Sequence, residues 1–451
     1  MDQIDRLRRL GLFDSRVPRY TSFPTTPNFS PSVGARFQAE CLAAVDPAEP
    51  VSVYVHIPFC ERLCWFCACH TQGTKTLAPV EAYIAALEAE LALVAASLPP
   101  GVRMGRLHWG GGTPTILPPP LIHRLAAAIR AAIPPADTLE FSVEIDPTQV
   151  DRARIAALAE EGMTRASLGV QDFDPLVQQA IGRLQSFEAT REAIEALRDC
   201  GVESLNADLV YGLPHQTLAR LDATLERTLS LRPDRLALFG YAHVPWVAKR
   251  QKLIDAAALP DDLARWRLAG QAAGRLVAEG FDRIGIDHFA RPADALAQAA
   301  REGRLRRNFQ GYTDDLCPTL IGVGASSVSR FPAGYVQNAP ATAAWGKRVT
   351  EGGLAGVRGH ALSDEDRLRA RAIEMLLCDF RLDFTELAAR FGTLAAVLGP
   401  TAREVLDRFD GFVTAEPNLL AILPEGAPLA RIIASAFDDR LGDNARFSRA
   451  S

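Results

Sequence analysis

Residues 51–70 read VSVYVHIPFCERLCWFCACH and join a short apolar run to a loop that holds four cysteines. The apolar run is typical of a buried strand. Cys60, Cys64, Cys67 and Cys69 lie too close together for ordinary disulfide bridges. Thiolates this dense can converge on one metal centre. The stretch therefore predicts a strand that leads directly into a metal site.

The spacing of these cysteines favours an iron–sulfur cluster. Zinc sites usually take their ligands in two well-separated pairs, and no second pair follows this loop. Three thiolates from one loop can hold three irons of a [4Fe-4S] cluster. If Cys69 is not a ligand, the fourth iron is left open for chemistry. A zinc site, and a redox thiol or a chance grouping, stay open as alternatives.

Further apolar runs follow along the chain, with helical stretches between them. Strands are predicted to start at Gly105, Leu139, Thr164, Glu203, Arg235 and Phe281. A helix is predicted after the cysteine loop, because apolar residues fall on one helical face at Val80, Ile84, Leu87, Leu91, Val94 and Leu98. Repeated strand–helix units favour a parallel sheet, closed or partly closed as a barrel. A doubly wound open sheet is the alternative.

Polar residues stand near the end of each predicted strand. They are His56, Glu144, Asp146, Gln171, Asp172, Asn206, Asp208, Tyr241, His243, Asp287, His288 and Arg291. A parallel barrel gathers the carboxyl ends of its strands on one face, so these residues predict a shared pocket, although each alone could cap a helix or turn. Three glycines at 110–112 let the backbone approach a ligand closely. They do not match a GxGxxG fingerprint, and a tight turn without a ligand is their alternative.

Composition sets the frame for these motifs. The chain has 451 residues, 48% hydrophobic and 23% charged, with a net charge of −5, which gives no support to nucleic-acid or anionic-membrane binding. No apolar run is long enough for a membrane span. Eight cysteines without a secretory leader predict a reducing cytosol. The amphipathic, arginine-rich start is expected to be a surface or docking helix, with a transit peptide as the weaker alternative.

The strand–helix alternation stops near residue 340. Ser363 and Asp366 resemble a capping box at the start of a helix. Helical segments are predicted at 384–392 and 401–412, a hairpin at 412–424 and a last helix at 427–441. This order suggests a winged-helix-like module. The segment holds more acidic than basic residues, which argues against DNA binding and for packing on the barrel.

The loop CERLCWFC fits the CxxxCxxC signature of the radical S-adenosylmethionine superfamily. An ordered set of motifs then resembles the oxygen-independent coproporphyrinogen III oxidases: PRYTSFPT, CWFCAC, LHWGGGTPT, SLGVQDF, DLVYGLPHQT, YAHVPW, IDHFARP and NFQGYT. The resemblance implies an α/β fold, a partial (β/α)6-type parallel barrel of the radical SAM class with a mainly helical C-terminal domain. We expect an N-terminal segment at 1–48, the barrel at 49–335 and the helical, winged-helix-like domain at 336–451.

The resemblance also implies a function. It indicates a cytoplasmic, monomeric enzyme of haem biosynthesis that converts coproporphyrinogen III to protoporphyrinogen IX by oxidative decarboxylation of two propionates. The expected cofactors are a [4Fe-4S] cluster and two molecules of S-adenosylmethionine, which yield a 5′-deoxyadenosyl radical, and an electron donor is required. The substrate carries several carboxylates, so arginines are expected along its approach. No nucleic acid and no membrane span are expected.

Site residues follow from the resemblance, position by position. The cluster ligands are Cys60, Cys64 and Cys67, whereas Cys69 is typical of the family without being a ligand. Contacts to the cluster-bound S-adenosylmethionine are Tyr54, Gly111 and Glu144. Contacts to the second molecule are Phe66, Gly112, Thr113, Gln171, Arg183, Asp208 and Ala242. Val328 stands where the family has a further aliphatic contact to cofactor.

The chain departs from the family pattern at a few positions. Ala68 and His70 replace a more usual Gly and Asn, and Gly240 replaces an Asn. The loop DDLCPTLIG places Thr319 where the family has an acidic residue. Two other functions stay open: a haem carrier or chaperone of the same superfamily, whose members usually lack the fourth cysteine and PRYTSFPT, and a non-enzymatic zinc protein.

Overall fold

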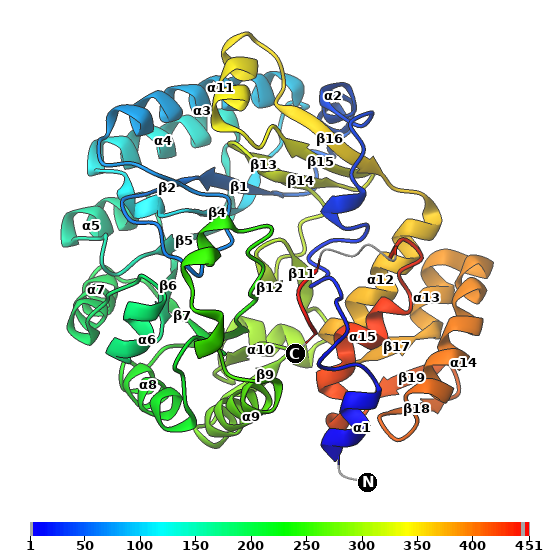
Figure 1. Cartoon of the computed structure of the whole chain (residues 1–451). Helices are drawn as coiled ribbons and strands as arrows, with labels where there is room; N and C mark the ends of the chain where they lie inside the picture. Colours follow the sequence, from blue (N-terminus) through cyan, green and yellow to red (C-terminus); the bar gives the residue numbers. More distant parts are fainter. Residues whose placement is uncertain (1–2, 443–446, 451) are drawn as a thin grey trace.

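The computed structural model describes residues 3–442 and 447–450. Its centre is a sheet of twelve strands in the order β16-β15-β14-β13-β1-β4-β5-β6-β7-β8-β10-β9 (Figure 1). The strands from β13 to β8 run parallel: β13 (Leu320–Val323), β1 (Val51–Ile57), β4 (Met104–Gly111), β5 (Pro135–Ile145), β6 (Arg165–Gln171), β7 (Ser204–Tyr211) and β8 (Arg235–Gly240). The linear order leaves the barrel partial, as expected.

The first six predicted strands are confirmed as β1 and β4–β8, but the seventh is wrong. The stretch from Phe281 forms a hairpin, β9 (Asp282–Ile284) and β10 (His288–Ala290), which pairs antiparallel with β8. The chain reverses because Gly285 takes a left-handed φ of 55°. The seventh parallel strand is instead β13, and the antiparallel strands β14 (Val328–Phe331), β15 (Gly334–Asn338) and β16 (Gly356–Ala361) extend the sheet beyond it.

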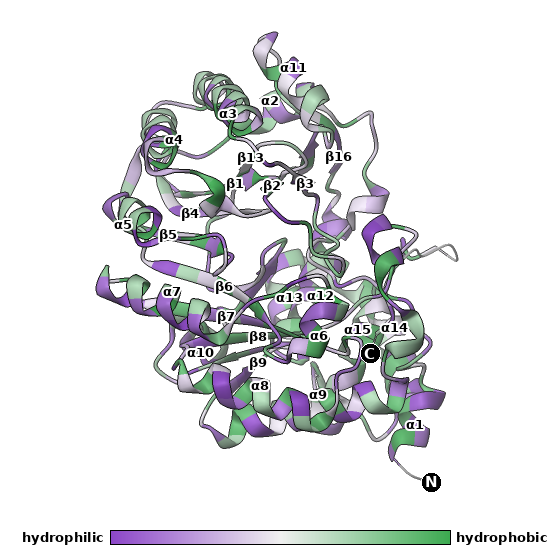
Figure 2. Cartoon of the chain, turned by 60° about the vertical axis from the view of Figure 1, so that its left-hand side comes forward, coloured by the Kyte–Doolittle hydropathy of each residue, from purple (hydrophilic) through white to green (hydrophobic). Residues whose placement is uncertain are grey.

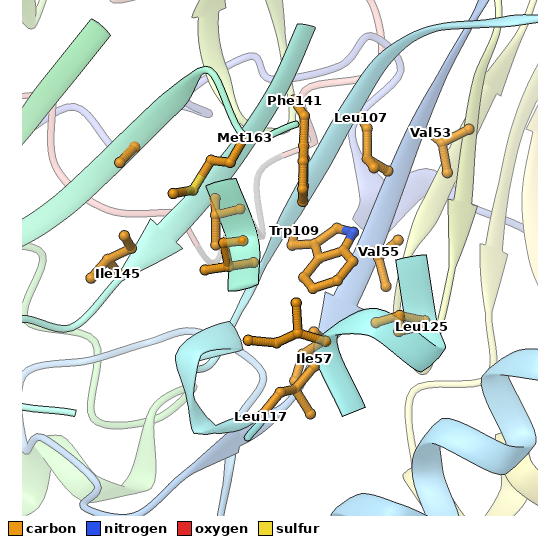
Figure 3. Packing of buried hydrophobic residues seen from close by; sticks show 14 of the residues in the cluster. Val53, Val55, Ile57, Leu107, Trp109, Leu117, Leu125, Phe141, Ile145 and Met163 are labelled. Carbon is orange, nitrogen blue, oxygen red and sulfur yellow. The ribbon is translucent and has the colours of Figure 1, made fainter. Parts of the chain in front are cut away.

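Helices cover the outer face of the parallel strands (Figures 1 and 2). They are α3 (Ala78–Ser97), α4 (Pro119–Ala132), α5 (Arg152–Glu160), α7 (Phe187–Asp199) and α8 (Leu218–Ser230). The apolar face predicted for the first of these is confirmed at Val80, Ile84, Leu87, Leu91 and Val94, which are buried, whereas Leu98 lies just beyond the end of the helix and is half-buried. Between strands and helices, Trp109 is fully buried and packs with Val55, Ile57 and Leu125 (Figure 3).

Apolar and polar side chains alternate along the strands, so that one face of the sheet packs against the helices and the other lines a polar barrel interior. In β1 the odd-numbered residues are apolar and face the helices, whereas Ser52, Tyr54 and His56 alternate with them. Register sets Tyr54 opposite His108 of β4, and His108 opposite Ser142 of β5. Near the start of the strands, Arg106, Glu140, Arg165 and Asp314 form an ion-pair network. Polar side chains therefore line the interior both near the start of the strands and near their ends.

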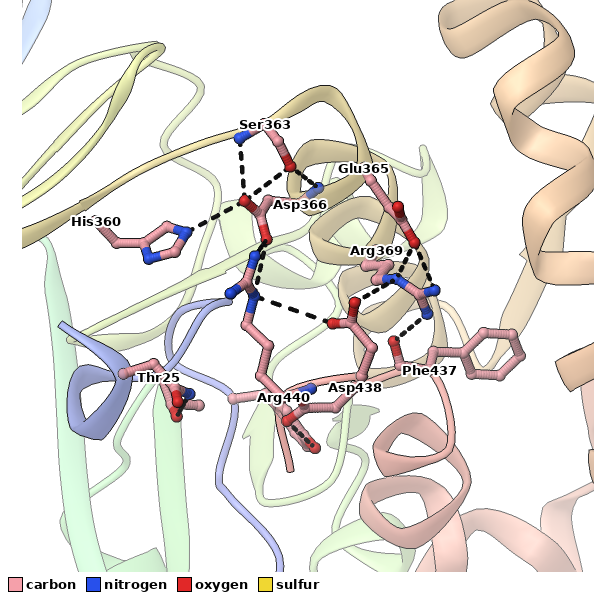
Figure 4. A network of polar contacts seen from close by, with 12 residues as sticks. Thr25, His360, Ser363, Glu365, Asp366, Arg369, Phe437, Asp438 and Arg440 are labelled. Atoms are coloured by element: carbon pink, nitrogen blue, oxygen red, sulfur yellow. Dashed lines mark hydrogen bonds and ion pairs between the residues drawn. The ribbon is translucent and has the colours of Figure 1, made fainter. Parts of the chain in front are cut away.

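The C-terminal helices pack beside the barrel. Helix α12 (Asp364–Cys378) starts with the predicted capping box, in which Ser363 and Asp366 bond each other's backbone N–H. Asp366 also accepts from His360 and Arg440 (Figure 4). Helices α13 (Phe384–Phe391), α14 (Gly399–Arg408) and α15 (Ala430–Ser435) follow, and β18 (Val413–Glu416) and β19 (Leu419–Ile422) form the predicted hairpin, joined by β17 (Arg381–Asp383).

The boundary expected after residue 335 falls inside β15, because the main sheet continues to Ala361. The division into domains and the winged-helix comparison stay predictions. The N-terminal helix α1 (Gln3–Arg9) docks within its own chain, since Leu7 and Phe13 share a buried cluster with α12 and α15 residues. Within the described ranges, no helix is long and apolar enough to cross a membrane.

Candidate functional site

The cysteine loop leaves β1 and closes on itself at its base. Two short parallel strands, β2 (Phe59–Cys60) and β3 (Gln72–Gly73), frame it. The glycine run packs directly beneath, because Gly112 and Thr113 donate backbone N–H bonds to the carbonyls of Ile57 and Phe59, both at 2.8 Å. A Cβ at Gly112 would lie 2.5 Å from the Phe59 carbonyl oxygen, so only glycine allows this approach.

The three motif thiols face groups from different parts of the barrel mouth. Thr113 Oγ1 lies 3.5 Å from Cys60 Sγ, and Arg183 Nη1 lies 3.4 Å from Cys64 Sγ. Cys67 Sγ accepts the backbone N–H of Cys69 at 3.4 Å. All eight cysteines are free thiols.

Among the described residues, no three His, Cys, Asp or Glu side chains are grouped tightly enough to hold a single metal ion. A cluster that takes one thiolate per iron does not require such convergence. Thiols carried on one framed loop at the barrel mouth fit that kind of cluster.

A second group of polar residues joins the ends of β1, β4 and β5. Glu144 accepts the backbone N–H of Gly111 at 3.0 Å and a hydrogen bond from His108 Nε2 at 3.4 Å. The His108 ring stacks on Tyr54, with centroids 5.7 Å apart. Tyr54 in turn donates to His56 Nδ1 at 3.0 Å. The three residues expected at the first S-adenosylmethionine, Tyr54, Gly111 and Glu144, are thus brought together.

Charge in this network is set by its hydrogen bonds. Burial alone raises the pKa of Glu144, but the bonds from His108 and the Gly111 N–H hold that pKa below its usual value. Burial lowers the pKa of His56, whose Nε2 donates to the His70 carbonyl at 3.1 Å. This hydrogen bond is made to the backbone of residue 70, so it does not depend on the histidine that replaces the usual Asn at that position. The mouth therefore offers the Glu144 carboxylate, with a lowered pKa, beside the His56 ring, whose pKa is also lowered.

Arg183 is a buried cation beside the cysteine loop. It forms an ion pair with Asp146 at 3.0 Å, with side chains only 9% and 7% exposed. Its other bonds reach the Gly169 carbonyl at 2.8 Å, Gln185 at 3.2 Å and Cys64 Sγ. These four contacts use at most four of the five guanidinium N–H groups and leave one donor for a ligand.

Gln171 and Asp208 lie on the strands next to Arg183. Gln171 has a left-handed φ of 66°, and a Cβ at Gly169 would lie 2.9 Å from its Nε2 and 3.1 Å from Arg183 Nη2. Asp208 accepts hydrogen bonds from Ser167 at 3.1 Å and from Asn206 at 2.8 Å. Burial raises the pKa of Asp208 to about 6. The positive φ of Gln171 is backbone strain of the kind found at functional sites.

Gln251 links two further expected contacts and was not foreseen from the sequence. It is buried, and its Nε2 donates to the carbonyls of Phe66 at 2.8 Å and Ala242 at 3.1 Å. Its Oε1 accepts the Val244 N–H at 2.6 Å. The side chain therefore ties the cysteine loop to the segment after β8.

Val328 stands apart from these groups. It is the first residue of β14 and packs with Phe29 and Tyr335 in a separate apolar cluster. The departure at Thr319 also lies elsewhere, since its carbonyl accepts the Ser52 N–H at the start of β1. The atypical loop is therefore at the opposite end of the barrel from the cysteines.

A cavity of about 670 Å³ adjoins the site at Tyr241 and Ala242. Its walls come from the end of β8, helix α9 (Asp262–Ala278), the β9–β10 hairpin and segments near both ends of the chain. The volume lies within the range of small-molecule sites.

Sequence reasoning also missed His108, Ser167 and the pairing of Asp146 with Arg183. A usable signal existed for His108, because Arg106, His108 and Gly110 alternate with the buried Leu107 and Trp109 along β4. Nothing local to Gln251 indicates that it reaches back to the cysteine loop.

The chain is similar to known proteins over its whole length. Residues 54–228 match the model of the radical SAM superfamily. An oxygen-independent coproporphyrinogen III oxidase of Cereibacter sphaeroides is 60% identical over 100% of both chains. One of Paracoccus denitrificans is 54% identical over 97% of both chains. The solved structure of coproporphyrinogen III oxidase (HemN) from Escherichia coli, a radical SAM enzyme, superposes with a TM-score of 0.90 at 36% identity, covering 95% of this chain and 100% of that one.

Proposed function

Because the chain belongs to the oxygen-independent coproporphyrinogen III oxidases, which are radical SAM enzymes, we propose that the mouth of its barrel carries out their reaction. The protein is an oxidoreductase of haem biosynthesis that oxidises coproporphyrinogen III without oxygen. It turns two propionates into vinyl groups with loss of carbon dioxide, giving protoporphyrinogen IX. The observation that carries the proposed site is the meeting of the cysteine loop, the Glu144 network and Arg183 at one end of the barrel.

The cofactors of the family are a [4Fe-4S] cluster and S-adenosylmethionine, which supply a 5′-deoxyadenosyl radical when bound. In this chain Cys60, Cys64 and Cys67 would hold the cluster. Cys69 donates its N–H to Cys67 and is left out of the ligand set.

Tyr54, Gly111 and Glu144 would hold the cluster-bound S-adenosylmethionine. Glu144 stays ionised because its hydrogen bonds lower its pKa, so it can accept from cationic or hydroxyl donors of that molecule. His108 orients the carboxylate and the Tyr54 ring from one side.

The second S-adenosylmethionine would lie against the residues that surround Arg183. The remaining N–H of the guanidinium suits a carboxylate. The full set of contacts proposed for it is Phe66, Gly112, Thr113, Gln171, Arg183, Asp208 and Ala242, with Val328 as a more distant aliphatic contact. Gln251 positions two of them through their carbonyls.

Three properties are proposed alongside the reaction. The reaction requires an external electron donor and acceptor. The chain acts as a monomer, since one copy supplies every proposed site residue. It works in the cytoplasm, which the eight free thiols support.

The test is an anaerobic assay with coproporphyrinogen III, S-adenosylmethionine and a reductant. We expect protoporphyrinogen IX, together with 5′-deoxyadenosine and carbon dioxide. Cys64→Ser should abolish the product, whereas Cys200→Ser, at an exposed thiol, should not. A reconstituted protein that binds haem but forms no product would point to the haem-carrier alternative.

A further inference from the structure

The cavity beside Ala242 is strongly basic, and we call it the arginine cavity. Its walls hold six arginines and three aspartates: Arg16, Arg19, Arg265, Arg283, Arg431, Arg449, Asp261, Asp262 and Asp287. An excess of cations in an enclosed space is costly unless anions compensate it. The contacts of these arginines show which guanidinium charges are paired with carboxylates of the protein.

Arg431 is buried without a carboxylate partner in the described part of the chain. All of its hydrogen bonds go to backbone carbonyls: Val17, Pro18, Arg449 and Ala450. Burial and the nearby Arg19 and Arg307 guanidiniums lower its pKa to about 9. The hydrogen bonds that hold this cation in place therefore come from neutral groups, and it forms no ion pair with a described carboxylate.

Among the described residues, Asp287 is an acidic residue that acts on Arg431, and its charge is already shared. His288 Nδ1 lies 2.8 Å away and Arg307 Nη1 lies 4.0 Å away, and these partners hold the pKa of Asp287 below its usual value despite burial. Within the described ranges, Arg19 donates to the Gly240 carbonyl at 3.0 Å, and its charge also acts on Asp287 without forming an ion pair. Arg283, on β9, exposes its side chain to the cavity and forms no ion pair with any described residue.

Much of the remaining wall is apolar, alongside the polar Tyr211, Tyr241, His243 and Ser448. Leu12, Trp246, Leu259, Trp266, Ile286 and Phe289 contribute to the apolar part. Arg449 is neutralised by Asp262 at 3.0 Å, and the Arg16 guanidinium lies over the Trp246 ring at 4.9 Å. The cavity thus combines a broad apolar surface with the guanidiniums of Arg19, Arg283 and Arg431, which form no ion pair in the described part of the chain.

We propose that the arginine cavity is where the substrate tetrapyrrole binds, and that Arg19, Arg283 and Arg431 receive its propionate carboxylates. The assignment rests on the proposed function, which makes the substrate a large apolar ring with four carboxylates. Guanidinium forks match carboxylates in geometry, and the apolar wall matches the ring. The cavity ends at Tyr241 and Ala242, so a ring bound there lies next to the proposed cofactor contacts.

The experiment measures binding and turnover separately. Anaerobic holoenzyme is titrated with coproporphyrin III, the fluorescent oxidised form that keeps four carboxylates, and with its neutral tetramethyl ester. The variants are Arg283→Gln and Arg19→Gln, and the control is Arg36→Gln, whose side chain is 94% exposed on another helix. Steady-state KM for coproporphyrinogen III and release of 5′-deoxyadenosine from S-adenosylmethionine with dithionite are recorded for each.

Each cavity variant should raise Kd and KM roughly 10- to 150-fold, the value of one charge-assisted hydrogen bond. Release of 5′-deoxyadenosine without substrate should stay at the wild-type level, and the control should remain within about twofold in every measure. The ester should bind wild type weakly and be insensitive to the substitutions.

Two results would overturn the assignment: both cavity variants binding coproporphyrin III as wild type does, or the ester binding as tightly as the acid. Failure of the proposed function looks different. Wild type would then form no protoporphyrinogen IX, while loss of coproporphyrin III binding in Arg283→Gln would still identify the cavity as a tetracarboxylate site. Arg431→Gln is left out because Arg431 also ties segments near the two ends of the chain together.

Discussion

Arg183→Ala should remove a buried cation from beside the cysteine loop and leave Asp146 without its ion-pair partner. Breaking a buried pair at one side typically costs about 3–5 kcal/mol. Asp146 keeps three hydrogen bonds, from the Thr148 N–H at 2.9 Å, the Thr148 hydroxyl at 2.8 Å and Gln149 at 3.0 Å. The loss of unfolding free energy should therefore lie near the low end of that range, at about 3 kcal/mol. Domains have roughly 5–15 kcal/mol of stability, so the barrel should stay folded.

The assay combines urea unfolding with activity under anaerobic conditions. Arg183→Ala should keep the visible absorbance of the cluster, lose about 3 kcal/mol of unfolding free energy and form almost no protoporphyrinogen IX. Arg183→Lys keeps the charge and should recover part of the stability but little turnover, because an ammonium group cannot reproduce the guanidinium contacts. Adding Asp146→Asn to Arg183→Ala should restore most of the lost stability, since it removes the uncompensated charge.

An Arg183→Ala protein would contradict both expectations if its unfolding free energy were within about 0.5 kcal/mol of wild type and its turnover near normal. The buried ion pair would then contribute nothing measurable to the unfolding free energy, and Arg183 would not belong to the second S-adenosylmethionine site.

Three further predictions concern the cluster and a buried carboxylate. Serine substitution of any motif cysteine should abolish the visible absorbance of the cluster and the activity, whereas Cys69→Ser should keep the cluster; loss of the cluster in Cys69→Ser would mean a different ligand set. Purification in air should inactivate the protein, and anaerobic reconstitution with iron and sulfide should restore it, so full activity of metal-stripped protein would contradict the radical mechanism. Burial raises the pKa of Glu90 from 4.5 to about 7. The folded state then holds a proton that the unfolded state has released, so the unfolding free energy should fall by up to about 3 kcal/mol as pH rises from 4.5 to 7. Urea titrations across that pH range should show this slope in wild type and a shallower one in Glu90→Gln.

Strand positions in the parallel part of the sheet follow from short apolar runs, which is why β1 and β4–β8 could be predicted. The hairpin after Phe281 could not, because its reversal depends on Gly285 adopting a left-handed φ inside an apolar run. The strands β14–β16 were not predicted from the sequence. They extend the sheet antiparallel from the edge of β13, and this pairing leaves no hydrophobic periodicity in the sequence.

The candidate site likewise contains residues that could be predicted from the sequence and contacts that could not. The cysteine loop and Glu144 are visible in the sequence because they stand at strand ends. Hydrogen bonds between residues far apart in the sequence are not visible in it. Gln251 bonds the Phe66 carbonyl across 185 residues, and Arg183 bonds Cys64 across 119. Such pairs depend on which strand ends become neighbours, which the fold decides and the local pattern does not.

Arg431 gives the arginine cavity an order of assembly. Its guanidinium bonds carbonyls at residues 17 and 18 and at residues 449 and 450, so one side chain fastens the two stretches of chain that wall the cavity. No fragment that stops short of residue 449 can complete this fastening. During synthesis the cysteine loop is therefore made hundreds of residues before the two stretches that wall the arginine cavity can be joined. We therefore expect the walls of the arginine cavity to be joined late in folding, well after the cysteine loop has been made.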